Sequence, residues 1–157
     1  MATLIRKAGE RDVDALASLN ADVQQLHAAA LPWLFKPAGP ETFAPADIAA
    51  LLERPDNLFF IAEVDGAAAG YAYAQIVHRP ETSFHYAHDL VHLHHISVRP
   101  AHRRHGVGAA LLAAVRAAAS ENGIALVTID VWTFNDTARA FFRRHGFVPN
   151  TERLWNR

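Results

Sequence analysis

The segment from residue 90 to residue 121 constrains the fold of this chain more than any other. An alternating, strand-like run ends at Pro100, a basic loop carries Gly106 and Gly108, and an alanine-rich stretch typical of a helix continues from Val107 to Glu121. A loop that leads from a strand into a helix brings free backbone N–H groups and the positive end of the helix dipole together. The segment therefore predicts an anion-binding site, although a tight turn with a solvated basic face explains the two glycines equally well.

The other elements follow from periodicity and turn residues. Asp65-Gly66 tolerates the positive φ angles of a tight hairpin, so the strands on either side of it should pair in antiparallel fashion. We expect strands at residues 3–7, 58–64, 69–77, 90–98 and 125–131 and a final edge strand at 147–155, with helices after residue 12 and at about 45–52, 107–121 and 135–146. This β-α-α-β-β-β-α-β-α-β order predicts an α/β fold with a mixed, mainly antiparallel central sheet flanked by about four helices.

Size and composition limit the class of protein. With 157 residues, of which 51% are apolar, the chain can bury one substantial core, and we expect a single domain spanning residues 1–157. A net charge of -1 offers no broad attraction to nucleic acid or to an anionic membrane, so neither is an expected partner. The lack of cysteine excludes disulfides, thiolate metal sites and a cysteine nucleophile. With no recognisable leader or membrane-spanning run, we expect a cytoplasmic monomer or homodimer.

Two other nucleotide-binding motifs fit the loop poorly. A dinucleotide fingerprint requires a third glycine, where Leu111 stands, and a shorter connection from the strand, although Asp130 lies near the expected acidic position. A Walker-type loop requires a Gly-Lys-Ser/Thr ending, which the sequence lacks. Dinucleotide binding and NTP hydrolysis are therefore disfavoured.

Two stretches of the C-terminal half resemble motifs of the GNAT superfamily of N-acyltransferases. The run from Ile96 to Leu112 reads ISVRPAHRRHGVGAALL and is similar to its acyl-CoA motif, an Arg/Gln-x-x-Gly-x-Gly/Ala loop between strand and helix. The stretch from Asn135 to Phe147 reads NDTARAFFRRHGF and is similar to its Asn-x-x-Ala helix ending in Gly-Phe. The resemblance implies a GNAT-like fold and the direct transfer of an acetyl group from acetyl-CoA to a primary amine in a ternary complex, without a metal. The amine could belong to a small molecule, a polyamine, a peptide or a protein.

The resemblance also implies how the cofactor would be held. Backbone N–H groups of the loop would bind the pyrophosphate, and main-chain groups of the preceding strand would hold the pantetheine arm like an added strand. Asn135 would lie near that arm, unless it only caps its helix. The predicted cofactor-binding residues are Ile96, Ser97, Val98, Arg103, Arg104, His105, Gly106, Val107, Gly108, Ala109, Asn135 and Phe142.

Amine acylation requires a group that removes a proton from the amine. Many members of the superfamily place a glutamate base six residues before the last valine of the strand, and His92 occupies that position here. Histidine can act as the base because its unperturbed pKa lies near neutral pH; His94 and His95 are lesser candidates. Phe142 stands where many members carry a general-acid tyrosine, which leaves Ser97, Tyr73 and Tyr86 as weak candidates for that acid. Partly exposed histidines bonded to backbone groups are the noncatalytic alternative.

The acceptor should contact the first helix, the loop that follows and the hairpin, which lie opposite the cofactor strands in the superfamily. Trp33 and Phe35 fit a core or a dimer contact equally well. The predicted substrate-binding residues are Gln24, His27, Trp33, Phe35 and Tyr73.

Two functions of other classes remain open at the level of sequence. A noncatalytic acyl-CoA sensor or interaction module is one, because Phe142 lacks the hydroxyl of the superfamily's general acid. A histidine-rich metal-binding protein is the other, because His92 and His94 share a strand face and His85 and His88 lie nearby in the sequence. Thioester turnover and a defined metal stoichiometry distinguish these functions.

Overall fold

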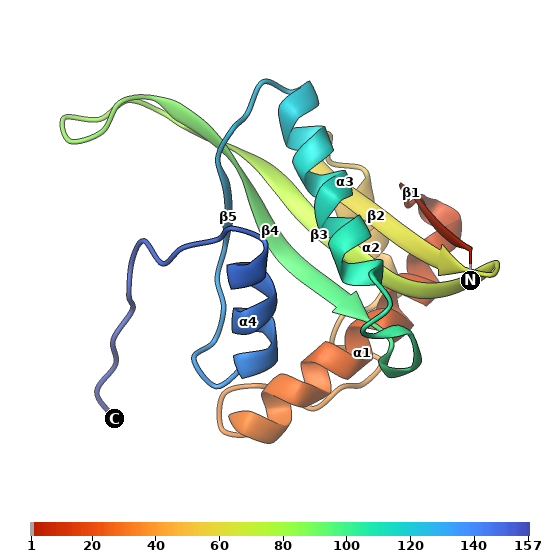
Figure 1. Ribbon diagram of the computed structural model, residues 1–157. Coiled ribbons are helices and arrows are strands. Elements are labelled where there is room, and N and C mark those ends of the chain that lie inside the picture. Colours follow the sequence, from red (N-terminus) through yellow and green to blue (C-terminus); the bar gives the residue numbers. More distant parts are fainter. Residues whose placement is uncertain (1) are drawn as a thin grey trace.

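A five-stranded sheet forms the centre of the molecule (Figure 1). The computed structural model describes residues 2–157. The strands lie in the order β1-β2-β3-β4-β5, and every neighbouring pair is antiparallel except β4 and β5, which are parallel. Their bounds are Thr3–Lys7 for β1, Asn57–Val64 for β2, Ala67–Arg79 for β3, His88–Val98 for β4 and Val127–Ile129 for β5.

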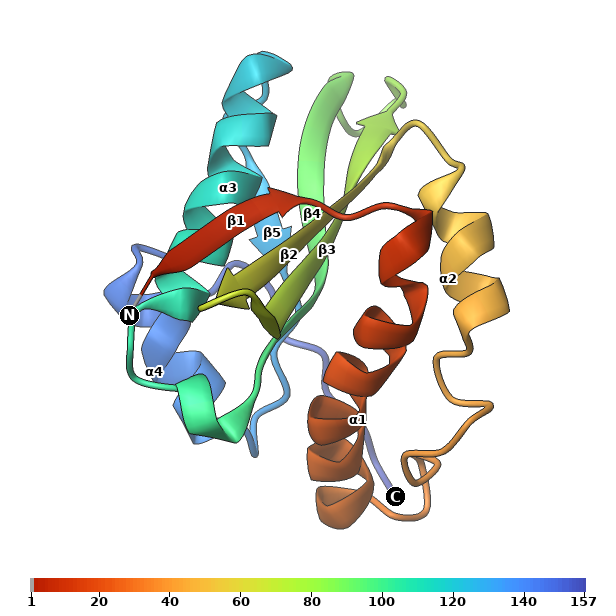
Figure 2. The same cartoon turned by 90° about the vertical axis from the view of Figure 1, so that its right-hand side faces the viewer.

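Helices cover both faces of the sheet (Figure 2). The helices α1 and α2 lie on one face, and α3 and α4 lie on the other. Their bounds are Val13–Ala30 for α1, Pro45–Leu52 for α2, Val107–Glu121 for α3 and Asp136–Arg144 for α4, with short 3-10 turns at Glu10–Asp12 and Pro100–His102. This arrangement confirms the predicted mixed α/β fold with a mainly antiparallel sheet and four flanking helices.

The hairpin between β2 and β3 turns at Asp65 and Gly66, as the sequence predicts. Both residues have positive φ angles, 49° and 83°. A two-residue turn with this geometry matches the right-handed twist of the strands that it joins. It fixes the register in which Val64 pairs with Ala67.

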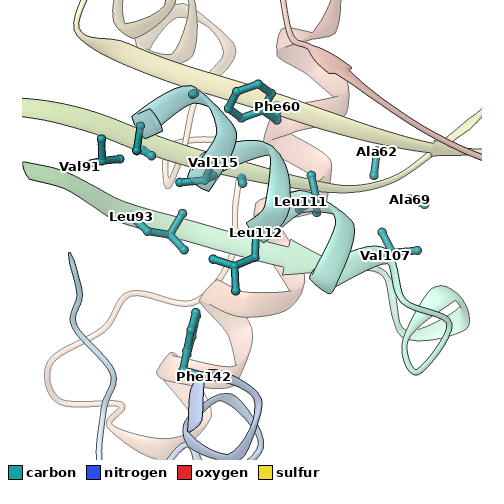
Figure 3. Packing of buried hydrophobic residues seen from close by; sticks show 14 of the residues in the cluster. Phe60, Ala62, Ala69, Val91, Leu93, Val107, Leu111, Leu112, Val115 and Phe142 are labelled. Carbon is teal, nitrogen blue, oxygen red and sulfur yellow. The ribbon is translucent and has the colours of Figure 1, made fainter. Parts of the chain in front are cut away.

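The larger core cluster lies between the sheet and α3 (Figure 3). The alanine-rich sequence of α3 favours helix formation, and its larger apolar side chains recur at helical spacing on the face turned to the sheet. Leu111, Leu112 and Val115 are buried there against Phe60 and Leu93. Each buried leucine contributes about 2 to 3 kcal/mol. This packing fixes the start of α3 beside the end of β4.

The predicted final strand at residues 147–155 is wrong, because the chain after α4 forms neither helix nor strand. Pro149 has no N–H to donate to a sheet. Trp155 instead packs against Trp33 and Trp132, with ring centroids 5.7 and 5.9 Å apart. The tail is therefore held by aromatic contacts with two loops, and the observed order of elements ends with α4.

Candidate functional site

The loop before α3 exposes a set of backbone N–H groups. Arg104 and Gly106 have φ angles of 64° and 82°, and Gly106 is the N-cap of the helix. The first backbone hydrogen bond of α3 runs from the N–H of Ala110 to the carbonyl of Gly106, at 3.0 Å. The N–H groups of residues 107–109 precede it and have no acceptor within the helix. Left-handed residues followed by a helix N-terminus form a concavity that binds anions.

The two glycines of this loop serve different purposes. A Cβ added at Gly106 would meet nothing within 4 Å, so the positive φ angle is what favours glycine there. A Cβ at Gly108 would contact the ring of Phe141 at 3.4 Å, which is an ordinary van der Waals distance. Gly106 thus shapes the turn, whereas Gly108 lies where α3 approaches α4.

The arginines around the loop are not equivalent. Arg99 donates to the carbonyl of Ala68 at 3.2 Å and to the hydroxyl of Ser18 at 3.1 Å, so it ties β4 to β3 and α1. Arg103 donates through Nε to the carbonyl of Val98 at 2.9 Å and fastens the loop to the end of β4. The exposed Arg104 makes no side-chain hydrogen bond within the described residues. Its guanidinium is therefore free to meet an anion above the loop.

The edge of β4 that faces β5 is open over half its length. Only Val91–Leu93 pairs with β5, so no strand among residues 2–157 pairs with that edge from His94 to Val98. The N–H of Arg99 points to β3, where it donates to the carbonyl of Ala69 at 2.8 Å. Because main-chain groups alternate along a strand, those of Ile96 and Val98 point away from β3. An extended ligand can pair with β4 at this edge, and the binding of a cofactor by Ile96 and Val98 stays a prediction.

A β-bulge rearranges the histidines of β4. Tyr73 pairs with His95, but its neighbour Ala74 pairs with Leu93, which leaves His94 as the extra residue. Strict alternation would place His94 and His95 on opposite faces. With the bulge, the ring of His94 stacks on Tyr73 at 4.8 Å and that of His95 meets the same tyrosine edge-on at 5.4 Å. Both side chains therefore lie on the face covered by α1 and α2.

His92 lies in a groove of about 530 Å³ at the end of β4 where β5 pairs. Its Nδ1 lies 2.8 Å from the hydroxyl oxygen of Thr128, and its Nε2 lies 3.7 Å from the exposed carboxylate of Asp130. His94, which also lines the groove, bonds through Nε2 to the side-chain oxygen of Gln75 at 3.0 Å. Of these two predicted catalytic histidines, His92 alone has a carboxylate beside it.

A buried hydrogen-bonded chain leads to the third histidine of β4. The amide nitrogen of Asn20 donates to the hydroxyl of Tyr71 at 2.9 Å, and that hydroxyl lies 3.0 Å from Nδ1 of His95. Burial raises the pKa of Tyr71, so its phenol stays protonated. Burial lowers the pKa of His95 to about 4. Sequence reasoning missed Asn20 and Tyr71, because the register of β3 and β4 brings Tyr71 to this histidine and the packing of α1 on the sheet brings Asn20 to Tyr71.

Ser97 and Phe142 are poorly placed for chemistry. The hydroxyl of Ser97 is buried and donates to the carbonyl of Leu19 at 2.9 Å, so its proton is already used within the fold. Phe142 is 4% exposed and belongs to the larger core cluster (Figure 3). Its ring packs edge-on against Phe141 and Phe147. These positions argue against Ser97 as a general acid and favour the core interpretation of Phe142.

Asn135 caps α4, since its side-chain oxygen accepts the N–H of Ala138 at 3.1 Å. The alternative that the sequence left open, helix capping, is therefore present in the structure. A contact between Asn135 and a cofactor stays a prediction. Because the side-chain oxygen of Asn135 is used in the cap, its side-chain amide nitrogen would have to make that contact.

Several predicted acceptor-binding residues meet in one aromatic cluster. His27 stacks on Phe35 at 5.0 Å, and Trp132 meets Phe35 edge-on at 5.2 Å. The cluster draws on α1, the loop after it, the loop after β5 and the C-terminal tail. Its members are His27, Trp33, Phe35, Trp132, Phe134 and Trp155. Sequence reasoning missed the last three, although the aromatic pair directly after the fifth strand was a signal.

The other two acceptor predictions lie outside the aromatic cluster. Gln24 donates to the carbonyl of Lys36 at 2.7 Å and so holds the loop after α1. Tyr73 is buried in the smaller core cluster, where its ring stacks on Phe59 at 4.3 Å. Of the five predicted residues, His27, Trp33 and Phe35 are brought together and these two are not.

Within residues 2–157, no three His, Asp or Glu side chains are arranged to hold a metal ion. His88 bonds through Nδ1 to the carbonyl of Tyr86 at 3.0 Å and does not join His92 and His94. None of the helices in the same residues is both long enough and apolar enough to cross a membrane.

Solved structures share this fold at low sequence identity. A mutant of the BH1408 protein from Bacillus halodurans has a TM-score of 0.92 at 20% identity, with 98% of each chain covered. The aminoglycoside N-acetyltransferase AAC(6')-Iy, in complex with a bisubstrate analogue of CoA and acetylneamine, has a TM-score of 0.80 at 24% identity, with 100% of this chain and 98% of that chain covered. An aminoglycoside acetyltransferase, meta-AAC0020, from an uncultured soil metagenomic sample and in complex with sisomicin has a TM-score of 0.69 at 17% identity, with 99% of this chain and 94% of that chain covered.

No curated protein matches the chain. The family described as Acetyltransferase (GNAT) family matches residues 20–147, a range that includes α3, α4 and the loop with the free N–H groups. This match covers most of the chain and agrees with both sequence motifs. The chain therefore belongs to the GNAT family of acetyltransferases.

Proposed function

We propose that the protein transfers an acetyl group from acetyl-CoA to a primary amine in a ternary complex. The observation that carries this proposal is the combination of two main-chain features: the free N–H groups at the start of α3 and the open edge of β4. A molecule with a diphosphate at one end and an amide-containing arm at the other satisfies both. Acetyl-CoA is such a molecule, and family membership supports this choice.

The cofactor lies across the end of β4 in this proposal. The N–H groups around Gly106 and Val107 bind its pyrophosphate, and Arg104 neutralises part of its charge. The pantetheine amides pair with the main chain of Ile96 and Val98 in the manner of an added strand. The thioester then lies beside the bulge in β4, close to the face on which the histidines lie.

His92 is the proposed base. An alkylamine with the pKa of lysine is protonated at neutral pH, and its deprotonation there costs about 4 to 5 kcal/mol. Nε2 of His92 removes the proton directly or through a water molecule, while Nδ1 donates to Thr128 and the carboxylate of Asp130 stabilises the resulting imidazolium. The neutral amine attacks the thioester carbonyl, the C–S bond breaks, and the thiolate leaves.

The departing thiolate needs no dedicated acid. A thiol with a pKa near 8.5 is a good leaving group, and water can supply the proton. Phe142 has no hydroxyl, and the hydroxyl of Ser97 is bonded to the carbonyl of Leu19, so neither side chain supplies that proton. With water as the proton source, these two features are compatible with catalysis.

The acceptor approaches from the side of α1 in this proposal. The aromatic cluster around Trp33 and Trp132 forms one wall of its path, and the groove that contains His92 forms the other. Two solved structures with the same fold are aminoglycoside acetyltransferases, which makes amino sugars one class to test. Polyamines, arylalkylamines and peptides with a free N-terminus are the other classes.

Release of CoA from acetyl-CoA across these four amine classes tests the proposed function. We expect amine-dependent turnover in at least one class, with the acetyl group on nitrogen in the product. A His92→Gln variant serves as the matched control, because it should bind CoA like the wild type and turn over far more slowly. Tight CoA binding with no amine-dependent turnover in any class would support the sensor instead.

A further inference from the structure

We infer that His95 donates a hydrogen bond from Nε2 to the acceptor substrate, and that Tyr71 and Asn20 hold it in the tautomer that makes this possible. The inference deepens the proposed function and rests on it, because the contact is made to the amine that the proposed reaction consumes. It assigns to His95 a role different from the base that the sequence allowed.

The hydrogen-bonded chain fixes the tautomer. The amide nitrogen of Asn20 can only donate, so the hydroxyl oxygen of Tyr71 accepts at 2.9 Å. The single phenolic proton is then directed at Nδ1 of His95, 3.0 Å away. Nδ1 must accept that proton in a hydrogen bond, and the neutral ring therefore carries its own proton on Nε2.

Nε2 is the part of the ring that reaches the outside. It has no hydrogen-bond partner among residues 2–157. Every side-chain nitrogen or oxygen atom that is buried in these residues does have a partner, so Nε2 is not one of the buried atoms. Nε2 therefore touches solvent, whereas Phe43 and Tyr73 meet the ring edge-on at 5.1 and 5.4 Å. A donor of fixed direction that touches solvent among aromatic side chains is suited to fix the orientation of a ligand.

The surroundings oppose a proton on Nδ1. Burial is the main cause that lowers the pKa of His95 to about 4, and the positive charges that His94 and His27 can carry lower it further. Tyr71 and Tyr73, the other titratable groups against the ring, have raised pKa values and stay neutral. A histidine that resists a second proton is a poor base at neutral pH. Its neutral ring keeps the N–H at Nε2 and remains a hydrogen-bond donor there.

The position of the ring favours the acceptor over the cofactor as its partner. The side chain of His95 lies with Phe43, Tyr71 and Tyr73 on the face covered by α1 and α2. The proposed cofactor contacts are the main-chain groups at the edge of β4 and the loop before α3. We therefore place the substrate atom that accepts from Nε2, a hydroxyl, ether or carbonyl oxygen, on the amine substrate.

Steady-state kinetics with two substitutions of His95 test this contact. Glutamine can place an amide N–H near the position of Nε2, whereas leucine cannot donate. We expect His95→Leu to raise the KM for the amine about 3- to 10-fold, with a smaller change in kcat and none in the KM for acetyl-CoA. His95→Gln should restore most of the amine KM. If His95→Gln loses kcat as completely as His95→Leu, His95 is a base and the inference is overturned.

The tautomer can be measured without any turnover. Two-bond nitrogen–proton correlations of the imidazole ring should show the proton on Nε2 in the wild type, and a mixture of tautomers in Tyr71→Phe, which removes the donor to Nδ1. His85→Leu, in the exposed loop between β3 and β4, should change neither the spectrum of His95 nor the amine KM. A proton on Nδ1 in the wild type would overturn the inference by itself. A protein that shows the Nε2–H tautomer and no turnover would overturn the proposed function instead.

Discussion

The two sides of β4 differ in how their sites are built. On the side of α3, the candidate cofactor site consists mostly of main-chain groups, whose direction follows from a left-handed turn, a helix N-terminus and an open strand edge. On the side of α1, the candidate acceptor site consists of side chains from at least four segments. A main-chain site depends on local geometry that a short motif encodes, whereas a side-chain site depends on how distant segments pack.

This difference predicts that substitutions on the two sides will have different effects. Changes near the loop should alter CoA affinity, and changes among the histidines and aromatics should alter turnover or the KM for the amine. A single substitution that changes CoA affinity and the KM for the amine to the same extent would contradict the separation of the two sites.

The largest effect is expected at His92. Replacing it with glutamine removes the proposed base, and loss of a general base lowers kcat by about 100- to 10,000-fold. Isothermal titration should give a CoA affinity close to that of the wild type. An unchanged kcat would remove His92 from the mechanism.

A paired substitution in the loop tests the other side. In Gly106→Ala, a φ angle of 82° becomes strained by about 1 to 2 kcal/mol, and relief of the strain turns the N–H groups away. We expect CoA to bind about 5- to 30-fold more weakly. Gly108→Ala is the matched control, since its Cβ would only contact Phe141 at 3.4 Å, and its affinity should change less than about 3-fold. Equal losses in the two variants would indicate that the turn geometry does not matter.

A smaller effect is expected from the C-terminal tail. Trp155→Ala removes the ring that packs between Trp33 and Trp132 and loosens the aromatic cluster. The KM for the amine should rise about 2- to 5-fold while CoA affinity stays constant. Leu154→Ala is the control, because that side chain is 85% exposed. Loss of CoA affinity in Trp155→Ala would contradict the separation of the two sides.

The smallest effect concerns stability and pH. Burial lowers the pKa of His95 to about 4 from an ordinary value of 6.5, so between these values the unfolded chain binds more protons than the folded one. Stability must then fall as the pH decreases from 6.5 toward 4. His95→Gln removes this contribution, and its loss of stability between pH 6.5 and 5 should be smaller than that of the wild type by about 1 to 2 kcal/mol. Urea unfolding at both pH values measures the difference. If the free energy of unfolding changes equally with pH in the wild type and in His95→Gln, His95 is not buried in its neutral state.

The sequence was sufficient for those parts of the fold that local rules determine. Val107–Glu121 is the helix that its composition predicts, and Asp65 and Gly66 form the predicted turn. Each of these outcomes depends on residues within one helix or one turn.

The features that the sequence did not predict, or predicted wrongly, depend on contacts between distant segments. The bulge at His94, which turns His94 and His95 to the same face, is a property of the pairing between β3 and β4 and has no signature within β4. Residues 147–155 have enough apolar residues for a strand, but Trp155 finds aromatic partners in two loops instead. The bond from Asn20 to Tyr71 joins residues 51 positions apart.

The central claim is that main-chain N–H groups before α3 hold the diphosphate of CoA. Titration of the labelled protein with CoA and, separately, with pantetheine, which lacks the diphosphate, tests it directly through the amide resonances of Gly106, Val107 and Gly108. The account predicts that CoA shifts these three resonances strongly, whereas pantetheine shifts those of Ile96 and Val98 and leaves the loop unchanged. Saturation with CoA that leaves the resonances of the loop in place would contradict it.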